Sequence, residues 1–181
     1  YDYLRLMFAR IGIPHSPSTG LPIQSQTVTQ MVDQVHKIKE GTKAYLLSPI
    51  IRGRKGEYRK EFSNLLKKGF QRVKIDGEFY ELDNVPNLEK NIKHDIDVVV
   101  DRIVIDKSLG NRLADSFETA LQLSDGLAAI ELASGKENGK RIVYSANYSC
   151  PESGFTIEEI EPRLFSFNNP VGACQHCDGL G

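Results

Sequence analysis

The sequence has few cysteines, and their number is odd. Its 181 residues include three Cys and no Trp. A disulfide-rich secreted domain usually carries an even set of cysteines, so three argue against a disulfide framework and fit a reducing compartment. No apolar run approaches the roughly 20 residues that span a membrane, and no secretory leader is visible. We therefore expect a cytoplasmic protein without a membrane segment.

Catalytic motifs are missing as well. The glycine- and lysine-containing stretches 53–56 and 135–140 lack the spacing of a phosphate-binding loop and the hydroxyl that follows its lysine. Four scattered His form no nucleophile–base pair and no metalloprotease motif. We expect that this chain is not an enzyme and that it neither binds nor hydrolyses ATP.

The charge is balanced in total but uneven along the chain. Lys and Arg number 23, Asp and Glu number 24, and the net charge is −1. Residues 37–74 hold twelve Lys or Arg and three Asp or Glu, a local charge of +9, so the remainder carries −10. One face should therefore be basic and another acidic. The basic residues 52–60 could contact DNA phosphates, although a solvated loop is the plainer interpretation.

Hydrophobic periodicity predicts a mixture of helices and strands, which indicates an α+β (mixed α/β) domain. Helices are expected at 1–11, from a capping box of Thr27 and Gln30 to residue 38, around 62–68, and at 112–121. Strands are expected at 44–51, with a break at Pro49, and at 72–76, 78–82, 94–106, 127–132 and 142–144. Asp76-Gly77 predicts a hairpin turn. Within 94–106 the apolar residues occupy even positions before about residue 99 and odd positions after about residue 101. This switch in the alternation predicts a β-bulge or burial on both faces.

The C-terminal cysteines have the spacing of half a zinc knuckle. Cys174 and Cys177 lie three residues apart, which suits two thiolates on one tetrahedral metal. Cys150 is placed to begin a second pair, but Ser153 stands where its partner thiolate would be. Because a hydroxyl is a poor zinc ligand, the site would have three thiolates and no fourth.

Five ordered blocks resemble the UvrA subunit of the bacterial nucleotide excision repair complex. They are YDYLRL at the start, QTV with QMVD at 26–33, DVVVDR at 97–102, RLADSFETAL at 112–121, and EPRLFSFNNPVGAC with CDGLG at the end. The resemblance covers the whole chain, so we expect a piece of a longer UvrA-like protein.

The resemblance implies a domain layout and a function. Residues 27–141 would form the UvrB-binding domain, 1–26 would connect it to an ATP-binding body, and 142–181 would return to that body and start a zinc-containing signature region. The segment would dock the UvrB helicase subunit of a DNA damage-recognition protein, for loading at lesions. ATP, magnesium, homodimer formation and most DNA contact would belong to the longer parent. The alternative is a basic segment, residues 52–74, that mainly contacts the DNA backbone.

Two arginines match positions that in UvrA proteins are associated with gripping UvrB, namely Arg72 and Arg102. The residues themselves add some support. Arg72 should share a strand face with Lys74. Arg102 falls at a position where the alternation of the strand would place an apolar residue. We therefore take Arg72, Arg102 and Lys74 as candidate partner-binding residues, with solvated surface charge as the plainer alternative.

The incomplete ligand set predicts weak or absent zinc binding. We expect that protein prepared without added metal contains well under one zinc per chain, because Ser153 replaces a thiolate. Elemental analysis measures this. A stoichiometric zinc that is lost in Cys174→Ala would instead show that three thiolates and another ligand suffice.

Overall fold

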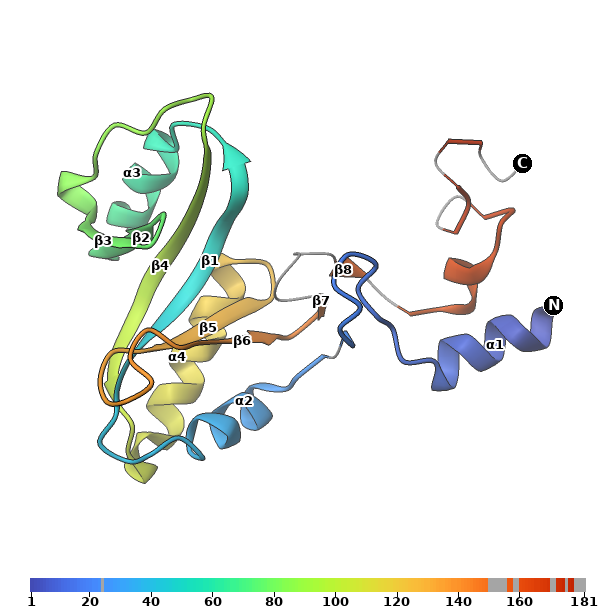
Figure 1. The fold of residues 1–181 in the computed structure, drawn as a ribbon, viewed down its shortest axis with the longest axis horizontal. Coiled ribbons are helices and arrows are strands. Elements are labelled where there is room, and N and C mark those ends of the chain that lie inside the picture. Colours follow the sequence, from blue (N-terminus) through green and yellow to red (C-terminus); the bar gives the residue numbers. More distant parts are fainter. Residues whose placement is uncertain (24, 150–155, 158–159, 170–171, 175, 178–181) are drawn as a thin grey trace. The chain divides into compact units, whose positions relative to one another are not determined.

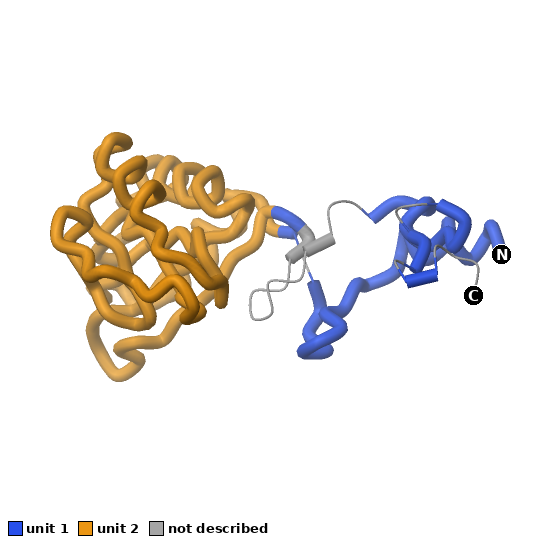
Figure 2. The backbone as a smooth tube through the Cα atoms, turned by 90° about the horizontal axis from the view of Figure 1, so that it is seen from above, with its two compact units in different colours: residues 1–25, 147–181 blue, residues 26–146 orange. Residues whose placement is uncertain are grey.

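The computed structural model describes residues 1–23, 25–149, 156–157, 160–169, 172–174 and 176–177. The chain divides into two compact units (Figure 2). Unit 1 comprises Tyr1–Ser25 and Asn147–Gly181, and unit 2 comprises Gln26–Ala146. Among the residues described, no helix is both long and apolar enough to cross a membrane.

Unit 2 is built on a six-stranded antiparallel sheet with the order β3-β2-β4-β1-β5-β6 (Figure 1). Its strands are β1 (Lys43–Lys55), β2 (Arg72–Ile75), β3 (Glu78–Glu81), β4 (Lys93–Val104), β5 (Leu127–Leu132) and β6 (Arg141–Ser145). The two longest strands, β1 and β4, pair along most of their length and form its centre. Together with the helices, this sheet confirms the predicted α+β class.

Three α-helices of unit 2 pack against one face of this sheet. They are α2 (Val28–Val35), α3 (Arg59–Lys67) and α4 (Gly110–Leu123). A short 3-10 turn, η1 (Leu82–Asn84), lies between β3 and β4, and another, η2 (Lys107–Leu109), precedes α4. One buried cluster joins α2 and α4 to Ile103 of β4 and to Ile105 just after this strand. A second joins α3 to β4 through Ile96 and Val98. The predicted capping box of Thr27 and Gln30 is confirmed at the start of α2.

The predicted bulge in β4 is confirmed at Val100. Leu46 pairs with Asp101 while the next residue, Leu47, pairs with Val99, so Val100 is one residue more than β1 can match. An extra residue reverses the side-chain alternation that follows it. Ile96 and Ile103, which differ in parity, can therefore both face the helices.

The prediction of a first strand over 44–51, broken at Pro49, followed by a loop at 52–60, is wrong for the break and for residues 52–55. β1 continues through Pro49 to Lys55. The reason lies in β5, which pairs with β1 only from Ala44 to Leu47. Beyond Leu47 no described strand pairs with this edge of β1, so Pro49, which has no N–H, removes no ladder bond there. Register shifts on both sides of Ile51 absorb the irregularity.

The predicted hairpin at Asp76-Gly77 joins β2 to β3. Both turn residues have positive φ, 50° and 96°, which suits a two-residue turn. The Asp76 carboxylate accepts a hydrogen bond from the Asp95 N–H at 2.8 Å and contacts Nδ1 of the buried His94 at 2.7 Å. Nε2 of His94 lies 3.2 Å from the Glu89 carbonyl oxygen. Acceptors at both ring nitrogens favour the imidazolium form.

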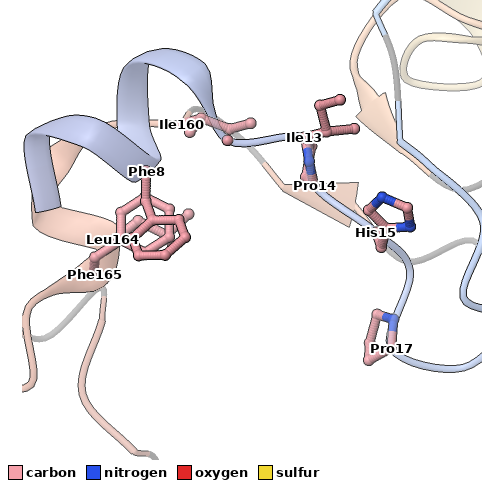
Figure 3. A pocket seen from close by; sticks show the side chains of 9 residues that line it. Phe8, Ile13, Pro14, His15, Pro17, Ile160, Leu164 and Phe165 are labelled. Carbon is pink, nitrogen blue, oxygen red and sulfur yellow. The ribbon is translucent and has the colours of Figure 1, made fainter. Parts of the chain in front are cut away.

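Unit 1 has a small apolar contact between its first helix and its C-terminal part. α1 (Asp2–Ile11) lies against the 3-10 turn η3 (Pro162–Phe165), where the rings of Phe8 and Phe165 are 5.9 Å apart. A largely apolar hollow of about 290 Å³ is lined by residues of these two elements and by Gly12, Ile13, Pro14, His15, Pro17 and Ile160 (Figure 3). The remaining strands, β7 (Tyr148–Ser149) and β8 (Thr156–Ile157), pair with each other.

The His94–Asp76 pair predicts pH-dependent stability. The hydrogen bond to Asp76 raises the pKa of His94. Partial burial raises the pKa of Asp76, but hydrogen bonds from the Asp95 N–H and His94 outweigh it and lower that pKa. The pair is therefore fully stabilising above the ordinary Asp pKa of about 3.9 and below the ordinary His pKa of about 6.5.

We expect the stability of unit 2 to fall as pH rises through the raised pKa of His94, by about 1.5 kcal/mol, the contribution of one charged hydrogen bond. Thermal unfolding between about pH 5 and 8 should show this fall. His94→Gln should have a flatter profile over that range. Parallel profiles for the two proteins would contradict the assignment to His94.

Candidate protein-binding site

The sheet face opposite the helices carries all three sequence-predicted partner-binding residues. Val73 and Ile75 belong to the helix-side core, so the alternation of β2 places Arg72 and Lys74 on the other face. After the bulge, Arg102 lies on this same face, directly opposite Tyr45 of β1. We call it the open face. Its small apolar cluster of Leu47, Val99 and Ala129 includes no helix residue among those described.

Arg102 has an uncommitted side chain. It is exposed, and its guanidinium makes no ion pair or hydrogen bond within the part of the chain that the structure describes. Its backbone N–H donates to the Asp101 carboxylate at 2.8 Å. All five N–H donors of the Arg102 guanidinium are thus available to a partner.

Arg72 is paired but still accessible. Its Nε donates to Glu81 Oε1 at 2.5 Å, across the β2–β3 hairpin, and the two side chains are 39% and 49% exposed. Exposed pairs of this kind contribute little to stability. One carboxylate oxygen occupies one donor, so Arg72 keeps further N–H groups for a second acceptor.

Lys74 is committed to an internal ion pair. Its Nζ lies 2.6 Å from both carboxylate oxygens of Glu131 on β5, and the side chains are only 15% and 10% exposed. Nearby, Arg141 binds Asp97 through two hydrogen bonds of 2.5 and 2.8 Å, which raise the pKa of Arg141. Asp97 is the register partner of Lys74. The two pairs therefore tie β2, β4, β5 and β6 together, and a partner-binding role for Lys74 stays a prediction.

A polar hollow of about 330 Å³ lies beside the bulge of β4. It is lined by Gly69, Phe70, Gln71, Arg72, Val99, Val100, Asp101, Arg102 and Arg112. β2 pairs with β4 only at Ile96–Val98, so residues 99–104 have no strand on this side among the described residues. The hollow occupies that open edge, and three arginines from β2, β4 and α4 meet at it.

Arg112 is a site residue that the sequence reasoning missed. Its Nη2 and Nε donate to the Asp101 carboxylate at 2.7 and 3.2 Å, and the Ser116 hydroxyl donates to the same carboxylate at 3.0 Å. The Arg112 side chain nevertheless remains 63% exposed. Arg112 and Ser116 are four residues apart on α4, so they share a helix face. The sequence spacing could have shown that Arg112 and Ser116 lie side by side. It could not show that both donate to Asp101, which lies on a distant strand.

The predicted zinc ligands are only partly described. Cys174 is an exposed free thiol and Cys177 a half-buried one. Cys150, like Ser153 at the fourth position, lies outside the described residues. The ligand set therefore stays a prediction.

Comparison with known proteins gives a family match and several close relatives. The UvrA interaction domain matches residues 26–134. UvrABC system protein A of Rhizobium meliloti is 60% identical over 198 residues, and that of Brucella abortus is 61% identical over the same length. The protein of Bradyrhizobium diazoefficiens is 59% identical. In each case the match covers 100% of this chain and 20% of the relative, so the chain spans about a fifth of their length.

The Lys74–Glu131 pair predicts a large stability effect from a single substitution. Lys74→Ala leaves the Glu131 carboxylate nearly buried and unpaired, which should lower the free energy of unfolding by about 3 kcal/mol. Urea unfolding measures this. Lys74→Met combined with Glu131→Leu should recover most of the loss, because it removes both charges. A single variant as stable as the parent would contradict a structural role for the pair.

Proposed function

The chain belongs to the UvrA family, and from that premise we propose that it is part of a DNA damage-recognition protein of nucleotide excision repair. Its unit 2 would dock the UvrB subunit, so that UvrB can be loaded at a lesion. The docking surface would be the open face of the sheet around the polar hollow.

One observation carries this proposal most directly: three arginines line a single hollow, and Arg102 has no internal acceptor among the described residues. Arginine is favoured at protein interfaces because its planar guanidinium binds carboxylates through two parallel hydrogen bonds and also stacks on rings. The chemistry of the hollow therefore suits acidic side chains of a partner. Arg72 and Arg102 are the primary candidates, and Arg112 extends the site.

Asp101 gives this site a preformed geometry. By binding Arg112 through both carboxylate oxygens, it holds the guanidinium at the edge of the hollow before any partner arrives. A side chain already fixed in place loses less conformational entropy on binding. Asp101 would therefore act as a positioning residue, and Arg112 as a contact.

The remaining functions are proposed for the longer parent protein. It would be an ABC-type ATPase that acts as a homodimer in the cytoplasm, and it would use ATP and magnesium outside this chain. Unit 1 would belong to its ATP-binding body, and any zinc would be held by the Cys150, Cys174 and Cys177 set. The chain itself would have no catalytic role.

The rival function is direct DNA binding as the main role of unit 2, through the basic residues 52–74. UvrB binding by the chain separates the two functions, and a DNA titration at two salt concentrations measures any phosphate contacts, which weaken steeply as salt rises. Under the docking proposal, the chain binds purified UvrB in the absence of DNA and ATP.

We expect Arg72→Ala and Arg102→Ala each to weaken UvrB binding about tenfold or more. Removing an interfacial Arg costs about 2 kcal/mol, since the bond is lost and the partner carboxylate stays unpaired. Arg112→Ala should act in the same direction. Calorimetric titration gives the affinities, and thermal unfolding should show little change for Arg72→Ala and Arg102→Ala, whose side chains are accessible.

Arg54→Ala is the matched control, because it removes one exposed guanidinium far along β1 from the hollow. It should bind UvrB like the parent chain. If Arg72→Ala and Arg102→Ala bind UvrB normally and lose DNA affinity, the docking proposal fails. A much lower melting temperature for Arg102→Ala would instead assign that side chain a structural role.

A further inference from the structure

The far end of β1 and the start of β4 form a two-stranded ribbon. β5 leaves β1 after Leu47, and β2 pairs with β4 only as far as Ile96. Beyond these points β1 and β4 pair with each other as far as Lys55 and Lys93, and one hydrogen bond from the Asp76 N–H to the Asp95 carbonyl supports the ribbon's side. Figure 1 shows this end of the two strands reaching past β5 and β6. We call residues 51–55 and 93–96 the ribbon.

The ribbon and the turns next to it are rich in exposed cations. Residues 52–60 and 89–95 contain seven Lys or Arg and three Asp or Glu. Six exposed cations make no ion pair within the described part of the chain, namely Arg52, Arg54, Lys55, Lys60, Lys90 and Lys93. Most nearby acids have other contacts. Asp95 accepts from the Gly53 N–H, Asp76 binds His94, and Glu57 lies 3.4 Å from Arg59.

Two cations face each other directly across the ribbon. Lys55 is the register partner of Lys93. Like charges at opposite positions of an antiparallel pair are destabilising, so folding alone gives no reason for this arrangement. Partial burial and the neighbouring Arg54 lower the pKa of Arg52, although Asp125 acts in the other direction. The repulsion between the cations of the ribbon is therefore not balanced by ion pairs with described acidic residues.

The backbone that carries these cations is held in place. The Tyr58 hydroxyl lies 2.9 Å from the Arg54 carbonyl oxygen and 3.1 Å from that of Lys55. The Tyr58 ring packs so closely on Gly56 that a Cβ there would come within 2.9 Å of it. The strand end is thus fixed to the start of α3, and its cations are presented from a rigid support.

We propose that this ribbon is a second binding site of unit 2, which contacts the phosphate backbone of duplex DNA without reading its sequence. Arg and Lys side chains make most phosphate contacts in such complexes, and a two-stranded ribbon is narrow enough to lie along a DNA groove. Lysine is depleted in protein–protein interfaces, and the ribbon supplies Lys55 and Lys93. The site is separate from the arginine-lined hollow, and it would add weak DNA affinity to the proposed docking role.

The test is DNA binding by the 181-residue chain, measured by fluorescence anisotropy with a duplex of about 20 base pairs between about 50 and 200 mM salt. The parent chain should bind with a micromolar dissociation constant that weakens steeply with salt. Lys55→Gln combined with Lys93→Gln should weaken binding about tenfold and reduce the salt slope by about two, one for each lost phosphate contact. Its melting temperature should not fall, since the change relieves a repulsion.

The matched control is Lys37→Gln combined with Lys39→Gln, which removes the same charge from exposed positions just after α2. It should bind DNA within about twofold of the parent, because distant exposed charges are screened. Equal losses for the two double variants would overturn the proposal and leave only a net-charge effect. So would a parent chain that does not bind DNA at low salt. Loss of UvrB binding with unchanged DNA binding in the ribbon variant would assign the ribbon to protein docking instead.

Discussion

The single extra residue at Val100 sets the two faces of the sheet. Without it, strict alternation along β4 would direct Ile103 and Ile105 away from the helix-side core that Ile96 and Val98 enter. With it, both halves of the strand bury apolar side chains under helices, and Asp101 turns to Arg112 and Ser116 on α4. Arg102 is left on the open face. The core and the proposed docking site therefore depend on the same irregularity.

The open face combines internal ion pairs with available cations. Lys74–Glu131 and Arg141–Asp97 link four strands beside the apolar cluster of Leu47, Val99 and Ala129. Breaking such pairs is costly, so they hold the face in one arrangement. Arg72, Arg102 and Arg112 lie around the neighbouring hollow. A rigid, charged face of this kind can bind a partner with little reorganisation, which lowers the cost of association.

The sequence predicted what depends on neighbours in the chain. Helical spacing located α4 through Leu113 and Phe117, turn chemistry located the hairpin at Asp76-Gly77, and a parity switch located the bulge. The sequence-based predictions failed where the structure depends on contacts between elements far apart in the chain. Pro49 is tolerated because the pairing of β5 with β1 ends at Leu47, and Lys74 finds its acceptor 57 residues away. The Asp101 acceptor of Arg112 was missed for the same reason. The roles of Arg72 and Arg102 came from family resemblance and stay proposals.

The most direct test of the central claim is to observe the arginine side chains during UvrB binding. The Nε–H groups of Arg72, Arg102 and Arg112 can be followed by NMR in the labelled chain while unlabelled UvrB is added. The docking account predicts that these three signals shift or broaden first, and that those of Arg54 and Arg59 at the far end of unit 2 change little. Signals that change at Arg54 and Arg59 while the three arginines of the hollow stay unperturbed would contradict it.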